Sequence, residues 1–139
     1  MLVGCREPSA PPWEEIDLSK AVRVEPSAQY IAWWNELEAC SGLSGNIYAV
    51  AFYVLPNDST IRVGSEFYWG YWIKEGDKII LAGPWATSEK LVKHEEMHAL
   101  LQSPLHPAAY FNGPCGDLTY PNEAQNSEEP GIGSLNGTG

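Results

Sequence analysis

The segment His94-Glu95-Glu96-Met97-His98 holds two histidines four residues apart, with a glutamate directly after the first. On an α-helix, residues four apart lie on the same face, so both imidazoles can point at one metal ion. Glu95 lies about 100° further round such a helix. There its carboxylate can accept a proton from water without displacing a ligand. The spacing therefore requires a helix, and it indicates a zinc ion held by His94 and His98 with Glu95 as a general base.

The residues around this segment are those of a helix about four turns long. A Thr or Ser N-cap at positions 87–88, followed by Glu89, opens a helix well. Ser103-Pro104 then ends it near Gln102. Four residues give the helix apolar surface to bury, namely Leu91, Met97, Leu100 and Leu101. The motif is therefore expected inside a packed helix.

His106 is the natural third metal ligand. It follows His98 by eight residues, and the break at Ser103-Pro104 allows the chain to turn back toward the metal. Pro107 stiffens the segment that carries His106. A catalytic zinc ion has three protein ligands and one open position, so His94, His98 and His106 would complete the set.

Acidic residues provide the alternatives. Asp117 or Glu123 could replace His106 as third ligand. Metal-bound histidines are commonly oriented by a carboxylate hydrogen-bonded to the second ring nitrogen. Glu96, Asp117 and Glu123 are equal candidates for that role.

The motif and the residues after it resemble the zincin metallopeptidases. His94-Glu95-x-x-His98-Ala99-Leu100-Leu101, then His106-Pro107, Tyr110-Phe111 and Cys115, are similar to small bacterial secreted proteins that carry the zincin motif. The resemblance covers one helix and the stretch after it, and implies a peptide or protein substrate. His106 departs from two subfamilies. Metzincins have a glycine after the second histidine and an earlier third histidine, and gluzincins use a glutamate on a later helix.

The remaining pattern predicts an α+β fold. Ser27 caps a helix that runs to about Cys40, and residues 47–55 form an apolar strand central in the sheet. Residues 60–63 form a short strand, and 67–74 with 78–82 form a hairpin. We expect a minimal zincin-like domain, with a backing helix and an active-site helix packed on a small, mostly antiparallel sheet. The resemblance implies an edge strand that binds the substrate backbone, near 69–74 or 78–82.

The chain length of 139 residues suits one domain. The proline-rich residues 1–25 are predicted to be a linker, residues 26–120 the zincin-like metal-binding domain, and residues 121–139 a disordered tail. The net charge of −10 argues against binding to nucleic acid or to anionic membranes.

The three cysteines bear on the compartment. Leu2-Val3-Gly4-Cys5 resembles a bacterial lipobox, which would attach the protein to a membrane through a lipid on Cys5 alone. Cys40 and Cys115 would then pair as a disulfide, which suits an extracytoplasmic protein, either secreted or a lipoprotein. The alternatives are two buried thiols in a cytosolic protein, or Cys115 as a metal ligand.

Two functions fit these patterns. The first is a zinc-dependent hydrolase, most simply a peptidase, in which Glu95 moves the proton. Tyr110 or Tyr120 could stabilise the oxyanion, or either could be a packing residue. The second is a non-catalytic zinc-binding module that acts outside the cytoplasm on a zincin scaffold. It would bind a partner through exposed aromatic residues, namely Phe67, Tyr68, Trp69, Tyr71 and Trp72.

Overall fold

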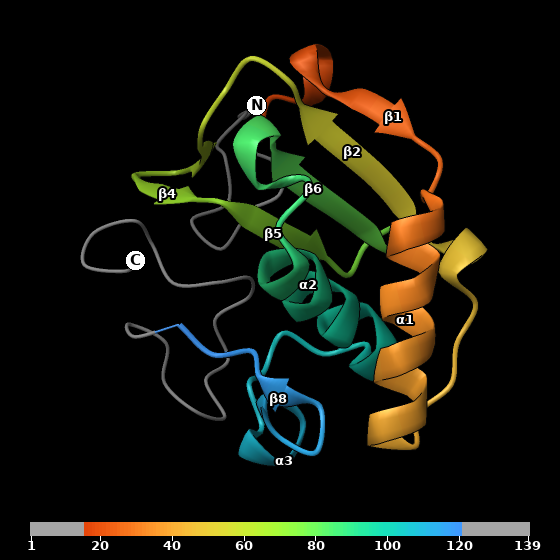
Figure 1. The fold of residues 1–139 in the computed structure, drawn as a ribbon. Coiled ribbons are helices and arrows are strands. Elements are labelled where there is room, and N and C mark those ends of the chain that lie inside the picture. The colour runs from red at the N-terminus through yellow and green to blue at the C-terminus, as the bar shows by residue number, and fades with distance from the viewer. Residues whose placement is uncertain (1–15, 121–139) are drawn as a thin grey trace, which may run out of the picture.

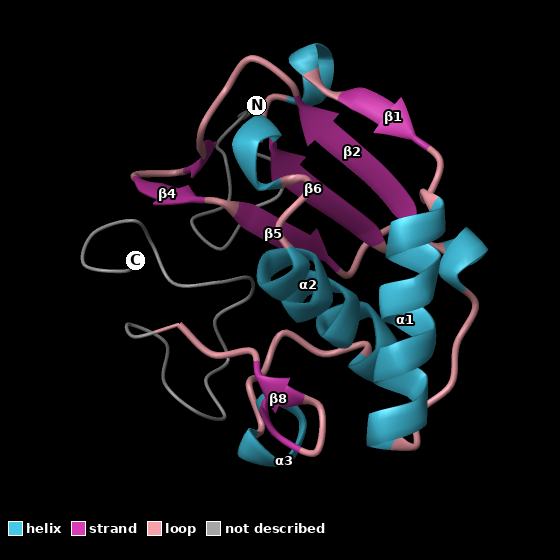
Figure 2. Cartoon of the chain, in the orientation of Figure 1, coloured by secondary structure: helices cyan, strands magenta, loops and turns pink. Residues whose placement is uncertain are grey.

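The structure is a computed structural model and describes residues 16–120 of the chain. Within them, two helices cover one face of a four-stranded sheet (Figures 1 and 2). The expected α+β fold is thus confirmed. Cys5, Glu123 and the predicted tail at 121–139 lie outside the described residues.

The sheet has the strand order β1-β2-β6-β5. Its strands are β1 (Val22–Val24), β2 (Ala51–Leu55), β6 (Lys78–Ala82) and β5 (Gly70–Ile73). The β1/β2 and β5/β6 pairs are antiparallel, and only β2/β6 is parallel. The sheet is therefore mostly antiparallel, as predicted.

The predicted hairpin is formed by β5 and β6. Gly76 and Asp77 adopt positive φ angles of 80° and 51° in its turn, a conformation that glycine and aspartate tolerate. Because β6 pairs on both sides, the prediction that 78–82 could serve as an edge strand is wrong. Within this sheet, β1 and β5 are the edge strands, and β5 packs against the helix that carries the histidines.

Three sequence predictions need correction. Residues 18–24 are not part of a linker, because Leu18–Lys20 forms a 3-10 helix and Val22–Val24 joins the sheet. The strand expected at 47–55 begins only at Ala51, because the Asn46 side chain caps a 3-10 helix at Ile47–Ala49. The strand predicted at 67–74 is divided between β4 (Glu66–Tyr68) and β5. β4 pairs with β3 (Ile61–Val63), the short strand predicted at 60–63, as a ribbon separate from the main sheet.

The backing helix is α1 (Ala28–Ser41). The Ser27 hydroxyl accepts a hydrogen bond from the Tyr30 amide at 3.1 Å, which satisfies one of the free N–H groups of the first turn. Gly42 ends the helix in the left-handed region, at φ 79°. The expected cap at Ser27 and the expected end near Cys40 are confirmed. The helix buries one face, which consists of Tyr30, Trp33, Trp34 and Leu37.

The second helix, α2 (Glu89–Leu101), carries the histidine motif. A 3-10 turn at Gly83–Trp85 leads into it from β6. The Ser88 hydroxyl caps it by accepting from the Leu91 amide at 3.3 Å, and Glu89 lies in its first turn beside the positive end of the helix dipole. The predicted boundaries of this helix are confirmed.

The side chains of the sheet alternate between two cores. On β6, Ile79 and Leu81 face α1 and α2, whereas Ile80 and Ala82 face the opposite side. There they pack with Ile61 and Val63 of β3, so the small ribbon covers the second face. Burial on both faces explains why β6 is apolar nearly throughout.

The chain after α2 folds into a small unit beside that helix (Figure 1). It comprises the short helix α3 (Ala108–Phe111) and two paired strands, β7 (Asn112–Gly113) and β8 (Gly116–Asp117). A disulfide between Cys40 and Cys115, with a Cα–Cα distance of 5.2 Å, joins this unit to the end of α1. The predicted pairing of these cysteines is confirmed.

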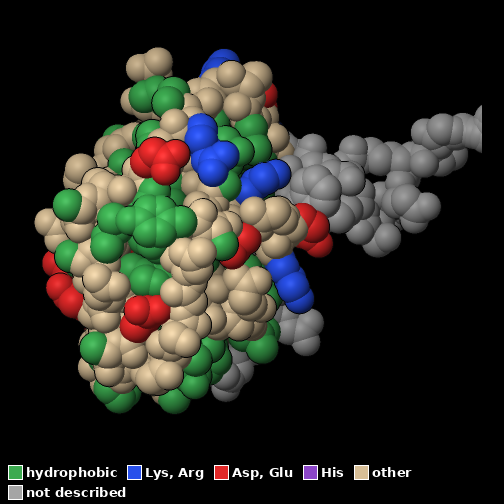
Figure 3. Space-filling model, turned by 90° about the vertical axis from the view of Figure 1, so that its right-hand side faces the viewer, with side chains coloured by type: hydrophobic (Ala, Val, Ile, Leu, Met, Phe, Trp, Pro, Cys, Tyr) green, Lys and Arg blue, Asp and Glu red, His purple; other side chains and the backbone are tan. Residues whose placement is uncertain are grey.

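Figure 3 shows the side of the molecule that lies to the right in Figure 1. Apolar side chains gather at its centre with acidic groups around them, and no histidine is visible there. All three histidines are buried, which agrees with this view. No helix among residues 16–120 is long and apolar enough to cross a bilayer.

Candidate metal centre

The three histidines meet at one point in the interior. One possible ligand atom from each of His94, His98 and His106 lies within 4.8 Å of the others. The exposed fractions of the three side chains are 0%, 0% and 2%. The structure thus brings together the three residues that the sequence nominated, and they could hold a metal ion.

His94 is oriented by a backbone carbonyl. Its Nδ1 atom lies 2.6 Å from the carbonyl oxygen of Leu118. A carbonyl oxygen only accepts, so Nδ1 carries the proton and donates it. The lone pair of the neutral ring is then on Nε2, which is the nitrogen available to a metal ion.

His98 is oriented in the same way by the end of its own helix. Gln102 adopts a left-handed conformation, at φ 54°, and turns the chain back on α2. The carbonyl of Ser103 then accepts a hydrogen bond from Nδ1 of His98 at 2.9 Å. The Gln102 side chain reinforces the turn by donating to Ala99 O at 2.8 Å and to Asp77 Oδ2 at 3.1 Å. The break expected at Ser103-Pro104 therefore also orients the ring of His98.

The two Nε2 atoms lie 3.3 Å apart. Because each Nδ1 atom carries its proton toward a carbonyl, both neutral rings direct a lone pair into the same space. Two nitrogens bound to one tetrahedral zinc ion at 2.0–2.1 Å would lie about 3.3 Å apart. The donor set and its spacing therefore suit a tetrahedral metal ion.

Phe111 of α3 closes this cluster from one side. Its ring centroid lies 4.9, 4.9 and 5.1 Å from those of His94, His98 and His106. The side chain is fully buried. No pattern in the sequence assigns a role to Phe111, because an aromatic residue in a predicted loop carries no signal of such a contact.

Glu95 is buried between α2 and the edge strand β5. The side chain is 0% exposed, and a Cβ atom placed on Gly70 would lie 3.1 Å from its Oε2 atom and 3.2 Å from its Cγ atom. The absence of a side chain at position 70 thus leaves space for the carboxylate.

Glu96 does not orient the histidines. It is fully buried, but neither carboxylate oxygen has a hydrogen-bond partner in the structure. Burial raises the pKa of Glu96 to about 9, even though the nearby charge of Lys93 acts in the opposite direction. Burial, together with the charge of Glu96, raises the pKa of Tyr30 on α1 to about 12. Glu96 therefore belongs to the contact between the two helices, and its expected role beside the metal ligands is wrong.

Asp117 is also excluded from the candidate centre. Its side chain is exposed on β8 and accepts hydrogen bonds from the amide and hydroxyl of Thr119. These bonds lower the pKa of Asp117. Among the described residues, the groups that orient His94 and His98 are backbone carbonyls rather than the predicted carboxylates. Backbone acceptors leave no trace in a residue pattern, so sequence reasoning could not find them.

The two tyrosines considered for oxyanion stabilisation differ in position. Tyr120 is buried, and its ring centroid lies 5.4 Å from that of His94. It also contacts the ring of Trp69 edge-on, and the Lys90 ammonium lies 4.6 Å from its centroid. Tyr110 is half-buried on α3. Of the two, Tyr120 is therefore the one whose ring contacts a histidine of the cluster.

The expected exposed aromatic surface is largely absent from the described part of the chain. Trp69, Tyr71 and Trp72 are 7%, 3% and 1% exposed, and only Phe67 is markedly accessible. Trp72 stacks on His98, with centroids 6.1 Å apart, and its Nε1 donates to Asp77 at 2.9 Å. These aromatic residues support the core and the histidines instead of a partner surface.

Comparison of the chain with protein-family models, with curated proteins and with solved structures finds no match. What can be said of its class therefore rests on its own geometry. The chain is a small α+β protein with a disulfide and with three buried histidines that could hold a metal ion.

Proposed function

We propose that the protein is a zinc-dependent hydrolase, most simply a peptidase of the zincin type. The observation that carries the proposal is the pair of Nε2 atoms 3.3 Å apart, each on a ring whose Nδ1 faces a carbonyl. His106 supplies the third nitrogen. A bound zinc ion would acidify a water molecule and polarise the substrate carbonyl.

Glu95 is the residue assigned to proton transfer. It follows His94 directly, and its helical offset turns its carboxylate toward β5 instead of into the cluster of three nitrogens. In this position it accepts a proton as water attacks the carbonyl and returns it to the leaving amine. General acid–base catalysis of this kind contributes about 10²- to 10⁴-fold.

The edge strand β5 supports a peptide as the substrate. One edge of β5 pairs with β6, and no strand of the described sheet pairs with the other edge. The strand also lies next to α2, against the Glu95 side chain. An extended peptide added to this edge would run along the helix that holds the histidines. The disulfide supports a site of action outside the reducing cytosol, either secreted or lipid-anchored at Cys5.

A second function is favoured by the burial of the cluster. His94, His98 and Glu95 are 0% exposed, and a catalytic centre must admit a substrate. A closed zinc site that only stabilises the fold would suit an extracytoplasmic binding module. The discriminating property is the fourth coordination position, which is open in the first case and filled by protein in the second.

The test combines metal analysis with a coordination probe. The purified protein should contain one zinc ion, and it should cleave members of a broad peptide library in a reaction abolished by chelation and restored by zinc. A hydroxamate, which binds only an open coordination position, should inhibit it and should perturb the spectrum of the cobalt-substituted protein. A metal-loaded protein whose spectrum does not change with the hydroxamate would support the binding module and contradict the hydrolase.

A further inference from the structure

The disulfide and the carbonyl that orients His94 lie on the same short segment. Cys115 precedes Leu118 by three residues, and the β7/β8 turn lies around it. Leu118 is 3% exposed, and its carbonyl accepts the proton of His94 Nδ1 at 2.6 Å. The position of this acceptor therefore depends on how firmly residues 112–118 are held against the rest of the domain.

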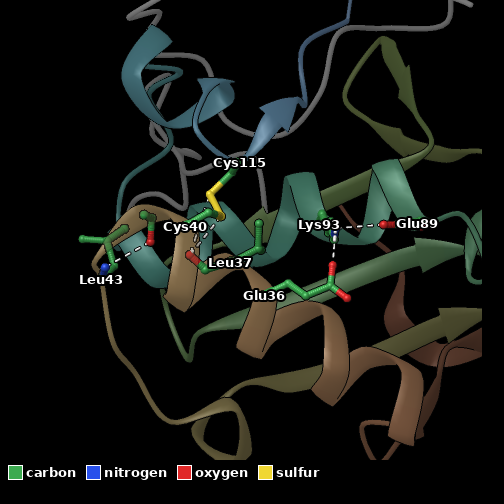
Figure 4. Close-up of a disulfide and its surroundings, with 8 residues drawn as sticks. Glu36, Leu37, Cys40, Leu43, Glu89, Lys93 and Cys115 are labelled. Atoms are coloured by element: carbon green, nitrogen blue, oxygen red, sulfur yellow. Dashed lines mark hydrogen bonds and ion pairs between the residues drawn. A yellow bond between two sulfur atoms is a disulfide. The ribbon is translucent and has the colours of Figure 1, made fainter.

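Few contacts of the backbone hold this segment. The Leu118 amide donates to Phe111 O at 2.8 Å, and β7 pairs with β8 over only two residues each. The covalent link to α1 is the Cys40–Cys115 bridge, whose sulfur atoms lie 3.4 and 3.7 Å from the carbonyl oxygen of Leu37 (Figure 4). Leu37 is fully buried in the core. The bridge thus ties the acceptor of His94 to the backing helix.

The bridge is accessible to a reductant. Cys40 and Cys115 are each half-buried, and Pro114 and Gly116 on either side of Cys115 are exposed. A pocket of about 280 Å³ reaches Cys115 and Leu118, and it is also lined by Glu89, Lys90, Lys93 and Asp117. The pocket gives a small dithiol a path to the Cys115 sulfur, which thiol–disulfide exchange requires.

We propose that this disulfide is a redox control on the metal centre, so that the protein binds its metal tightly only when Cys40 and Cys115 are joined. The inference rests on the metal site of the proposed function, and it adds control of the metal affinity by the redox state of the disulfide. Oxidation fixes residues 112–118, holds the Leu118 carbonyl on His94 and presents Nε2 to the metal. Reduction frees the segment and lets the His94 ring turn.

The chemical step is exchange with a small dithiol or a dithiol protein. One thiolate of the reductant attacks a sulfur of the bridge and the S–S bond breaks, which leaves a mixed disulfide. The second thiolate of the reductant then displaces the remaining cysteine. Two electrons and two protons pass to Cys40 and Cys115, and the reductant becomes a disulfide.

The expected size of the effect follows from what the bridge supports. Loss of a partner that orients a metal-bound histidine typically weakens metal affinity by about 10- to 100-fold. Coupling of two equilibria is reciprocal, so bound zinc should make the bridge harder to reduce by the same factor. The reciprocal effect provides a readout that does not depend on catalysis.

The experiment compares the zinc dissociation constant of the full chain in both redox states at 10 °C, in a Cys5→Ser background that leaves only the two bridge cysteines. Reduction uses a phosphine, which is removed before titration, and a Cys40→Ala/Cys115→Ala variant shows the affinity without thiol ligands. Hydrogen exchange follows the Leu118 amide and the amides of α2. Ile80→Val, in the core on the other face of the sheet, is the matched control for a general loss of stability.

The proposal expects zinc affinity to fall about 10- to 100-fold in both the reduced protein and the double variant. It also expects faster exchange at Leu118 with α2 still protected, and no change for Ile80→Val. Equal affinity in the two redox states would overturn it, as would a fall that accompanies loss of protection throughout α2. Failure of the oxidised protein to bind zinc at all would instead overturn the proposed function.

Discussion

Gly70 of β5 lies so close to the carboxylate of Glu95 that a Cβ atom at position 70 would come within 3.1 Å of Oε2. Few Cβ atoms in proteins have such a close neighbour. The glycine thus sets the place of the proposed general base, and it does so from the strand along which a peptide would bind. The proposed base and the proposed peptide-binding strand are therefore in direct contact.

Gly70→Ala should therefore move the Glu95 carboxylate while the histidines stay in place. Small displacements of a catalytic group can reduce the rate by as much as about 100-fold. We expect kcat to fall by about 10- to 100-fold with zinc content unchanged. Gly45→Ala is the matched control, because its Cβ would meet Trp34 and Leu100 at 3.2 and 3.3 Å, among residues of the core. Equal losses in the two variants would show that crowding alone, and not the position of Glu95, explains the effect.

The third ligand can be tested by zinc titration of single variants. His94→Ala, His98→Ala and His106→Ala should each lose most of the zinc affinity, because each removes one nitrogen of the cluster. Asp117→Asn should retain it, since its carboxylate is exposed and bonded to Thr119. In the wild-type protein, binding should weaken as pH falls, because protons compete for the imidazoles. Full affinity in His106→Ala would mean that another group completes the site.

Local rules were sufficient for much of this architecture. The spacing of His94 and His98, the Ser88 cap and the stop at Ser103-Pro104 predict α2 closely, because all of them act within one or two turns. The same holds for α1 and for the β5/β6 hairpin. The parallel pairing of β2 with β6 joins residues about 27 positions apart, from Ala51 to Lys78, and no local pattern specifies it.

Only the histidine side chains of the site could be predicted from the sequence. His106 was nominated because the break at Ser103-Pro104 lets the chain turn back and because a catalytic zinc ion takes three protein ligands. The carbonyls of Leu118 and Ser103 were missed because any residue has a carbonyl and only the fold decides where it points. Glu96 was misplaced for a related reason. Its type suggests a partner for histidine, but its helical offset turns it toward α1, where burial keeps it protonated.

The buried acid of Glu96 predicts an unusual dependence of stability on pH. Burial raises the pKa of Glu96 to about 9 in the folded protein, from an ordinary value of 4.5. The carboxyl is neutral in both states below about 4.5, so no stability is lost there. Above that value unfolding releases a proton, and stability falls by up to about 1.4 kcal/mol per pH unit until pH 9. Glutamine does not titrate, so the free energy of unfolding of Glu96→Gln should exceed that of the wild type by a margin that grows from pH 5 to pH 8.

Urea unfolding of the metal-free protein at several pH values measures that margin. The exposed Glu75 provides a matched control, since Glu75→Gln should follow the wild-type curve. A constant difference between Glu96→Gln and the wild type across this range would mean that Glu96 ionises normally in the folded state.

The disulfide should contribute to stability as well as to metal binding. Closing a loop between residues 75 positions apart is worth about 4 kcal/mol in the chain-entropy model. The Cys40→Ala/Cys115→Ala variant should therefore unfold at a distinctly lower denaturant concentration. Cys5→Ala, which leaves the bridge intact, should unfold like the wild type. A loss below about 1 kcal/mol in the double variant would indicate that the segment is held mainly by other contacts.

The kinetics of Glu95→Gln test whether Glu95 transfers a proton beside a zinc ion held by the three histidines. Glutamine has nearly the same shape, so zinc content and melting temperature should stay close to those of the wild type. It cannot accept the proton, so zinc-dependent cleavage in a peptide library should fall by about 10²- to 10⁴-fold. Zinc-dependent cleavage that continues at the wild-type rate in Glu95→Gln would contradict the account.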